Sequence, residues 1–89
     1  MYKIEYSEDF DDKYFNSLPK NLRTSIKKLI EEKLAFIPEI IGIPLKGDLM
    51  GFWRLRISDY RIIYKIKKDI VVVLIFKIDH RKDIYRQIH

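Results

Sequence analysis

The sequence predicts a single α+β domain in which one short strand precedes two helices and a meander of three strands. Residues 2–6 alternate between apolar and polar side chains, residues 8–34 carry apolar side chains at helical spacing, and residues 52–79 return to alternation with two breaks. At 89 residues the chain can form one hydrophobic core. We therefore expect an antiparallel-rich sheet of four strands, a two-helix hairpin on one face and a short C-terminal helical turn.

The first half of the chain predicts the first strand and both helices. Alternation in residues 2–6 is typical of a short strand. Ser7 is a suitable N-cap for a first helix over residues 8–17, because acidic side chains follow it where the helix dipole favours them. Pro19 ends that helix and can occupy the first turn of a second helix. The apolar stripe of the second helix reaches Leu34.

The second half predicts a long connection and then the meander. Residues 37–51 hold all three glycines and two of the three prolines, which is typical of a surface loop. We expect a two-residue turn at residues 58–59 and a three-residue turn around residues 67–69. The last strand is apolar on both faces along residues 70–76, which indicates a central position with the first strand as its other neighbour. We expect residues 83–88 to form a frayed helical turn at the C-terminus.

Composition excludes several classes of function. The chain has no cysteine, which excludes disulfides, thiolate catalysis and cysteine-based zinc sites. Its two histidines, His80 and His89, lack metal-ligand spacing, so we expect no metal and no cofactor. The N-terminus lacks the apolar core of a signal peptide, and no segment approaches the roughly 18 apolar residues of a membrane span. We expect a cytoplasmic protein with no membrane partner.

Positive charge is concentrated in the second half of the chain. Residues 1–43 hold seven Lys and Arg against eight Asp and Glu, whereas residues 44–89 hold eleven against five. This asymmetry favours a surface that faces a polyanion. Charge alone leaves RNA, DNA, an acidic protein and a merely solvated basic face open as interpretations.

The two-residue turn predicts which side chains face each other across the meander. Arg56 lies opposite Arg61, and Arg54 lies opposite Ile63. Like charges in direct cross-strand positions destabilise a sheet, and a bound anion would relieve the repulsion. We therefore expect an arginine-rich groove on the sheet face that the helices leave uncovered.

The last strand and the C-terminus extend this basic face. Lys77, Asp79 and Arg81 can project to the same side, although the uniformly apolar strand leaves its register open. An exposed sheet face solvated by long cationic side chains is the alternative. It leaves unexplained the apposition of the two arginines and the C-terminal cluster that follows, namely Arg81, Lys82, Tyr85 and Arg86.

Arginines with one histidine and one tyrosine suit phosphodiester chemistry. Guanidinium groups hold phosphate oxygens and stabilise the charge that develops in the transition state. RNA carries its own nucleophile, the 2′-hydroxyl, so a protein need only align the groups, neutralise charge and assist two proton transfers. His80 or Tyr85 could assist proton transfer, and an aromatic ring could equally stack on a base. Each could also be a structural or exposed residue without a catalytic role.

Four motifs in order resemble the RelE branch of the RelE/ParE toxin superfamily. They are LKGDL at residues 45–49, WRLR at residues 53–56, DYRIIY at residues 59–64 and HRKDIYR at residues 80–86. The resemblance covers nearly the whole chain. It implies a type II toxin, a ribosome-dependent and metal-independent endoribonuclease (mRNA interferase) that cleaves mRNA in the ribosomal A site, inhibits translation and arrests growth.

The resemblance also implies roles for individual residues. Arg61 matches an arginine that contacts the scissile phosphate, Arg81 one that stabilises the transition state, and Tyr85 a tyrosine that orients the substrate. Arg54 stands at the second of two lysine positions, and Phe52 stands at the first. Phenylalanine cannot accept a proton, and arginine is a poor general base near neutrality. The sequence therefore departs from the family pattern at the proton acceptor.

Lys46 and His80 are the remaining candidates for the general base. We assign RNA binding to the other cations of the basic half, with Lys46 included: Lys46, Arg56, Lys77, Lys82 and Arg86.

The resemblance implies a cognate antitoxin, the ribosome and mRNA as partners, and operator DNA only through the antitoxin complex. We expect an antitoxin helix or strand to cover an exposed apolar edge and displace the segment that carries Tyr85. Two rival functions stay open: a ParE-like inhibitor of DNA gyrase, and a non-catalytic co-repressor that acts while bound to its antitoxin.

Overall fold

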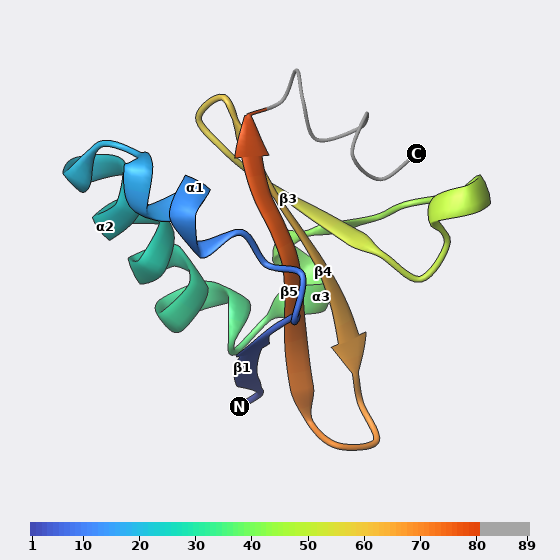
Figure 1. Ribbon diagram of the computed structural model, residues 1–89. Helices are drawn as coiled ribbons and strands as arrows, with labels where there is room; N and C mark the ends of the chain where they lie inside the picture. The colour runs from blue at the N-terminus through green and yellow to red at the C-terminus, as the bar shows by residue number, and fades with distance from the viewer. Residues whose placement is uncertain (81–89) are drawn as a thin grey trace.

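A five-stranded mixed sheet forms the centre of the protein (Figure 1). The structure is a computed structural model that describes residues 1–80, with residues 81–89 outside the described part. The strands are β1 Lys3–Tyr6, β2 Ile43–Pro44, β3 Trp53–Ile57, β4 Tyr60–Lys67 and β5 Val72–His80. Their order is β1-β5-β4-β3-β2; β1 runs parallel to β5, and the other pairs are antiparallel. The predicted α+β class and the pairing of the first strand with the last are confirmed.

The fifth strand, β2, lies within the segment that we expected to be a loop. It is two residues long and pairs Ile43 with Arg54 and Pro44 with Trp53. Proline lacks the N–H that an inner strand must donate, so β2 can occur only at the edge of the sheet. A proline-containing segment this short carries no alternation from which a strand could be predicted.

The helical segments are α1 Asp12–Ser17, α2 Lys20–Leu29, a π-helical turn η1 Ile30–Leu34, α3 Pro38–Ile41 and a 3-10 turn η2 Gly47–Leu49. α1 and α2 lie together on one side of the sheet, whereas η2 lies apart from them in the connection before β3 (Figure 1). The prediction that the first helix begins at residue 8 is wrong. Asp11 is the N-cap, because its carboxylate accepts a hydrogen bond from the backbone N–H of Tyr14 at 2.9 Å. Ser7 instead accepts from the N–H of Asp9 at 3.2 Å and forms a local turn.

The core lies between the helices and one face of the sheet. Side chains from α1, α2 and η1 meet alternate residues of the inner strands. Its buried members are Phe15, Leu18, Ile26, Ile30, Leu34, Leu55, Ile62, Tyr64, Val73, Ile75 and Ile78. Because strand side chains alternate between faces, the residues between these positions project to the opposite side of the sheet. That opposite face carries the charge discussed below.

A β-bulge in β5 changes this alternation. Ile75 and Ile78 are three residues apart, yet both are core residues. The pairing with β4 shifts at this point: Ile63 faces Lys77, whereas Tyr64 faces Ile75, so Phe76 is the extra residue. Phe76 contacts Phe52 on the open face. The bulge therefore places two consecutive side chains of β5 on the face opposite the helices.

The two turns of the meander differ from each other. Ile57 faces Tyr60 across the expected two-residue turn, in which Ser58 has a φ of 54°. The expected three-residue turn around residues 67–69 is wrong, because Lys67 pairs with Val72 and leaves a four-residue connection. Ile70 and Val71 lie in that turn and are 60% and 48% exposed. Because residues 70–76 are all apolar, the sequence pattern does not show where the turn ends and β5 begins.

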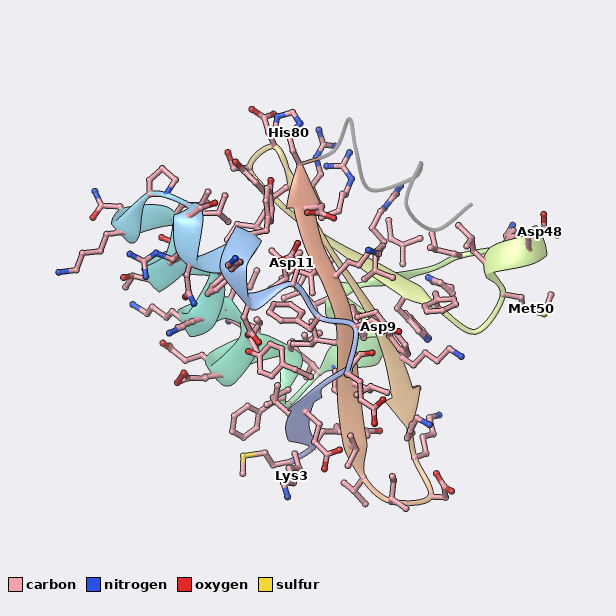
Figure 2. The ribbon with its side chains drawn as sticks, in the orientation of Figure 1. Lys3, Asp9, Asp11, Asp48, Met50 and His80 are labelled. Carbon is pink, nitrogen blue, oxygen red and sulfur yellow. The ribbon has the colours of Figure 1, made fainter. Side chains whose placement is uncertain are left out.

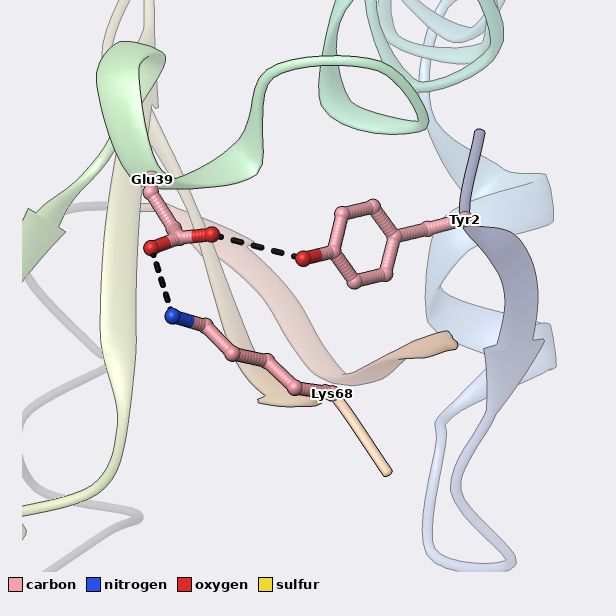
Figure 3. Close-up of polar contacts among 3 residues, drawn as sticks. All are labelled: Tyr2, Glu39 and Lys68. Carbon is pink, nitrogen blue, oxygen red and sulfur yellow. Dashed lines mark hydrogen bonds and ion pairs between the residues drawn. The ribbon is translucent and has the colours of Figure 1, made fainter. Parts of the chain in front are cut away.

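Polar contacts fix α3 and the N-terminus to the sheet. The buried hydroxyl of Tyr64 donates to the carbonyl of Pro38 at 2.6 Å; burial raises the pKa of this hydroxyl, which therefore stays protonated. Glu39 accepts from the Tyr2 hydroxyl at 3.3 Å and pairs with Lys68 at 2.9 Å (Figure 3). The hydrogen bond with Lys68 lowers the pKa of the Glu39 carboxyl. One carboxylate thus connects α3 with β1 and the β4–β5 turn.

Within residues 1–80, none of the helices combines the length and the apolar character that crossing a membrane requires.

Gly42 gives a test of how α3 is attached. A β-carbon at this position would overlap the Tyr64 hydroxyl and approach the backbone oxygen of Arg54. We expect Gly42→Ala to lower the free energy of unfolding by about 1–3 kcal/mol through overpacking. Tyr64→Phe should lower it by a similar amount, because the Pro38 carbonyl loses its buried donor.

Urea unfolding of both single variants and the double variant checks this prediction. Removing the hydroxyl removes part of the overlap, so the double variant should be less destabilised than the sum of the single variants. Additive losses would contradict the proposed contact.

Candidate nucleic-acid interface

The face of the sheet opposite the helices carries two rows of side chains across β3, β4 and β5. In the first row, Arg61 of β4 lies between Arg56 of β3 and Asp79 of β5. In the second row, Ile63 lies between Arg54 and Lys77. We call this surface the groove; its members are Arg54, Arg56, Arg61, Ile63, Lys77 and Asp79. The predicted cross-strand pairs Arg56–Arg61 and Arg54–Ile63 are both confirmed.

Arg61 is the most unusual side chain of the groove. It is only 9% exposed, and its Nε and Nη1 have no hydrogen-bond partner within residues 1–80. Buried N–H donors without an acceptor cost about 1–3 kcal/mol each, and charged groups cost more. The like charge of Arg56 stands directly across the strand pair. An anion at this position would satisfy the guanidinium and relieve the repulsion, so the geometry favours binding of a phosphate or carboxylate.

The groove remains cationic in spite of Asp79. Asp79 is the one carboxylate among the groove residues. It is 7% exposed and lies opposite Arg61. The groove therefore holds four cations, Arg54, Arg56, Arg61 and Lys77, and one anion. Arg54 and Lys77 are half-buried and Arg56 is exposed, so a ligand can reach them from solvent.

His80 lies away from the groove. It is the last residue of β5, at the end of the strand (Figure 2), and it pairs with Tyr60. Its ring packs edge-on against Tyr60, with centroids 5.4 Å apart, and Tyr60 packs on the helix-side core. Tyr14 belongs to the same corner; burial, followed by the effect of Tyr60, raises the pKa of its hydroxyl. Alternation places Asp79 and His80 on opposite faces, so His80 does not share the face that carries the groove.

The other candidate residues lie on the loop or outside the described part. Lys46 is exposed and precedes η2, in the connection between β2 and β3. The remaining four candidates, Arg81, Lys82, Tyr85 and Arg86, lie outside residues 1–80.

Sequence reasoning missed an aromatic cluster beside the groove. The rings of Phe52 and Phe76 meet edge-on with centroids 5.1 Å apart. The Lys65 ammonium lies 4.6 Å from the Phe52 centroid and 5.6 Å from that of Phe76, which is cation–π geometry. Phe52 stood out only as a departure from the family pattern, and Phe76 was hidden in an apolar run. The β-bulge, which places Lys77 on the same face as Phe76, has no simple sequence signal.

A cleft of about 240 Å³ opens at this cluster. Its walls come from the segment between β1 and α1, the connection before β3, and strands β4 and β5; its lining residues are Asp9, Asp48, Leu49, Phe52, Ile63, Phe76 and Lys77. Ile63 and Lys77 belong to the groove as well, so the cleft and the groove adjoin. A larger hollow of about 530 Å³ includes Trp53, Ile66 and the Glu39–Lys68 pair, but no arginine lines it. We place the candidate site at the groove because the Nε and Nη1 donors of Arg61 lack acceptors within residues 1–80, and an anionic ligand would supply them.

Comparison with solved structures defines the class of protein first. The fold matches a chain of the toxin–antitoxin complex RelBE2 from Mycobacterium tuberculosis with a TM-score of 0.81 and 25% identity, over 90% of this chain and 98% of that chain. It also matches the isolated E. coli RelE toxin with a TM-score of 0.73 and 21% identity, over 100% of both chains. The fold is therefore that of the small RelE-type toxins.

Sequence comparison then gives the family. The family described as "ParE toxin of type II toxin-antitoxin system, parDE" matches residues 4–85. Toxin RelG of Mycobacterium tuberculosis is 32% identical over 72 residues, which cover 81% of this chain and 83% of that protein. The chain belongs to the RelE/ParE superfamily of type II toxin–antitoxin toxins, as its motifs indicated.

Inorganic phosphate should stabilise the folded chain through Arg61. A ligand that binds only the native state at a hundred times its Kd adds about 2.7 kcal/mol to the free energy of unfolding. We expect sodium phosphate to raise the Tm of the parent chain relative to sodium chloride at equal ionic strength. Arg61→Met should abolish this increment, because the variant keeps an unbranched apolar stem and removes the donors.

Lys28→Met is the matched control, since Lys28 is exposed on α2 and its loss changes the net charge equally. It should keep the phosphate increment. An undiminished increment in Arg61→Met would contradict an anion site at Arg61.

Proposed function

We propose that the protein is a type II toxin that acts in the cytoplasm as a ribosome-dependent endoribonuclease, cleaves mRNA in the ribosomal A site and arrests growth. The observation that carries the proposal is the buried Arg61 guanidinium, whose Nε and Nη1 lack acceptors in a groove of four cations. Such a site holds a phosphate and stabilises added negative charge. Sequence similarity to Toxin RelG and the fold of the RelE toxins support the same function.

In the proposed reaction, the 2′-oxygen of the substrate attacks the adjacent phosphorus. A P–O bond forms to the 2′-oxygen and the bond to the 5′-oxygen breaks, which leaves a 2′,3′-cyclic phosphate and a 5′-hydroxyl. One proton leaves the 2′-hydroxyl and one reaches the 5′-oxygen, so no cofactor or metal is required. Arg61 holds the scissile phosphate, and Arg54 and Arg56 lie close enough in the sheet to neutralise the charge that develops.

Proton transfer is assigned differently from the sequence interpretation. His80 packs on the helix side against Tyr60, so we give it no role in the groove. Of the two earlier candidates for general base, Lys46 remains, on the exposed loop before η2. Arg81 and Tyr85 keep the roles that the resemblance implies, transition-state stabilisation and substrate orientation.

Inhibition of DNA gyrase is the second candidate function. The observation that favours it is the description of the matching family, which names the ParE toxin. The two functions differ in their need for Arg61: a nuclease requires its guanidinium at the phosphate, whereas inhibition by protein contact does not.

We also propose a cognate antitoxin as a partner. RelB–RelE complexes are known from Methanococcus jannaschii, where the matched chain is 24% identical with a TM-score of 0.69. In this chain, large apolar side chains are exposed along α3 and the edge strand β2: Ile37, Ile40 and Ile43 are 37%, 78% and 55% exposed. An edge strand with free backbone groups suits the addition of a strand or an amphipathic helix. Such a segment would keep Tyr85 from the substrate.

Primer extension on mRNA in a translating extract tests the nuclease. The parent chain should produce cuts that depend on translation, and Arg61→Ala and Arg81→Ala should reduce them about a hundredfold or more, the usual loss when one transition-state donor is removed. Lys28→Met should cleave like the parent.

Each variant is first checked for a cooperative unfolding transition. Growth arrest without cuts, accompanied by gyrase-dependent DNA damage, would overturn the nuclease in favour of the second function. The absence of cuts, DNA damage and arrest would point to a non-catalytic co-repressor.

Antitoxin binding should exclude RNA from the groove. We expect the toxin saturated with its antitoxin to bind a non-cleavable 2′-deoxy oligonucleotide at least tenfold more weakly than the free toxin does. Fluorescence anisotropy with a labelled oligonucleotide measures both states. Equal affinity in the two states would show that the antitoxin inhibits without blocking the groove.

A further inference from the structure

The Phe52–Phe76 cleft has features of a built binding site that phosphate chemistry does not use. Its floor is apolar: Phe52 and Phe76 are half-buried, and Ile63 beside them is 0% exposed. Alternation from the core residues Val73 and Ile75 places Phe76 on this face, and the β-bulge keeps Lys77 beside it on the same face. Bulges are common beside functional sites.

The cleft leaves room against the aromatic rings. The Lys65 ammonium covers both rings at cation–π distance, but Lys65 is not among the residues that line the cleft. The cation therefore lies outside the hollow, and the aromatic surface inside it stays available. A flat aromatic ligand can stack on the ring surface that Lys65 leaves open.

The charges of the cleft favour a base over a phosphate. Asp9 and Asp48 line it from two separate segments and lie apart in Figure 2. Carboxylates repel a phosphate, whereas they accept hydrogen bonds from the N–H groups of a nucleobase. Lys77 is the cation of the cleft and also belongs to the groove, where it lies opposite Ile63. The electrostatics thus change from cationic to mixed between the groove and the cleft.

The spacing suits one nucleotide. Arg61 and Ile63 are two residues apart on β4 and share a face, which puts the anion site and the floor of the cleft about 7 Å apart. A phosphate on Arg61 and the base of an adjoining nucleotide are separated by a comparable length.

We propose that the cleft is a stacking subsite for a single unpaired nucleobase next to the phosphate held by Arg61, with Phe52 and Phe76 as its specificity-determining residues. This inference rests on the proposed function for its substrate class, RNA. Stacking on an aromatic side chain is the usual way in which proteins hold single-stranded RNA bases. Phe52, which stands where the family pattern has a lysine, would then contact the base in this chain.

A trinucleotide with 2-aminopurine at the stacked position and 2′-deoxyribose at the cleaved position tests the subsite on the full-length chain. The fluorescence of 2-aminopurine falls when the base stacks. Phe52→Leu and Phe76→Leu should each lose the quenching and bind about tenfold more weakly. Phe52→Trp, which keeps an aromatic ring at this position, should retain both the quenching and the affinity of the parent chain. The matched control is Phe36→Leu, because Phe36 is 56% exposed and lies outside the cleft.

An abasic version of the trinucleotide separates the base from the phosphate. Phe52→Leu and Phe76→Leu should bind the abasic probe as the parent does, whereas Arg61→Met should weaken binding of both probes. Unchanged quenching in the two leucine variants, or an equal loss of affinity for the abasic probe, would overturn the subsite. A weaker complex with the antitoxin and unaltered base binding would assign the cleft to the antitoxin and also overturn it.

The two proposals fail separately. If the parent chain makes no translation-dependent cuts, the nuclease fails, while quenching on the isolated chain still decides the subsite. If the cuts depend on Arg61 but the leucine variants quench normally, the nuclease stands and the subsite is wrong.

Discussion

Alternation of side chains along β4 is the constraint on which both faces of the sheet depend. β4 is paired on both sides, with β3 and with β5. Its residues Ile62 and Tyr64 point into the core and are 0% exposed, while Arg61 and Ile63 point the other way. A shift of one residue in register would exchange the two sets and bury charge among the helices. The core therefore fixes the position of the groove as firmly as it fixes the fold.

This arrangement explains how the fold tolerates a buried guanidinium whose Nε and Nη1 find no acceptor within residues 1–80. Full burial of one large apolar side chain stabilises the fold by about 1.5–3 kcal/mol, and the core holds eleven buried members. The unsatisfied donors of Arg61 cost about 1–3 kcal/mol each, and the facing Arg56 adds repulsion. The core gain is larger, so the fold survives an unfavourable site. Local conflict of this kind within an otherwise consistent structure is what a functional site is expected to show.

The sequence predicted those parts of the fold that follow from periodicity and short turns. The two-residue turn at Ser58 and Asp59 fixed the register of β3 on β4, and with it the apposition of Arg56 and Arg61. It did not predict the bulge at Phe76, because a continuous apolar strand has no alternation for an extra residue to interrupt. Lys77 and Asp79 share one face, and the same alternation places His80 on the other.

Local competition between capping residues explains the other differences. Ser7 and Asp11 are both good N-caps, and propensity does not distinguish them. The chain uses Asp11 because β1 continues through Tyr6, and the Ser7 N–H then bonds to the Ile75 carbonyl at 2.8 Å. The pairing of β1 with β5 thus extends past Tyr6 and leaves the next residues to form a turn. A tertiary contact, absent from any local window of sequence, decides where α1 begins.

The bulge and the phenylalanine at position 52 have a joint consequence for the proposed chemistry. Phe52 cannot accept a proton, and arginine is a poor general base. The described part of the groove is therefore equipped to hold, orient and neutralise rather than to move protons. In the proposed subsite, Phe52 contributes stacking on the base instead of proton transfer, and Phe76, whose ring contacts Phe52, contributes the second aromatic surface. The chain would then depend more on precise placement of the 2′-hydroxyl than on a strong general base.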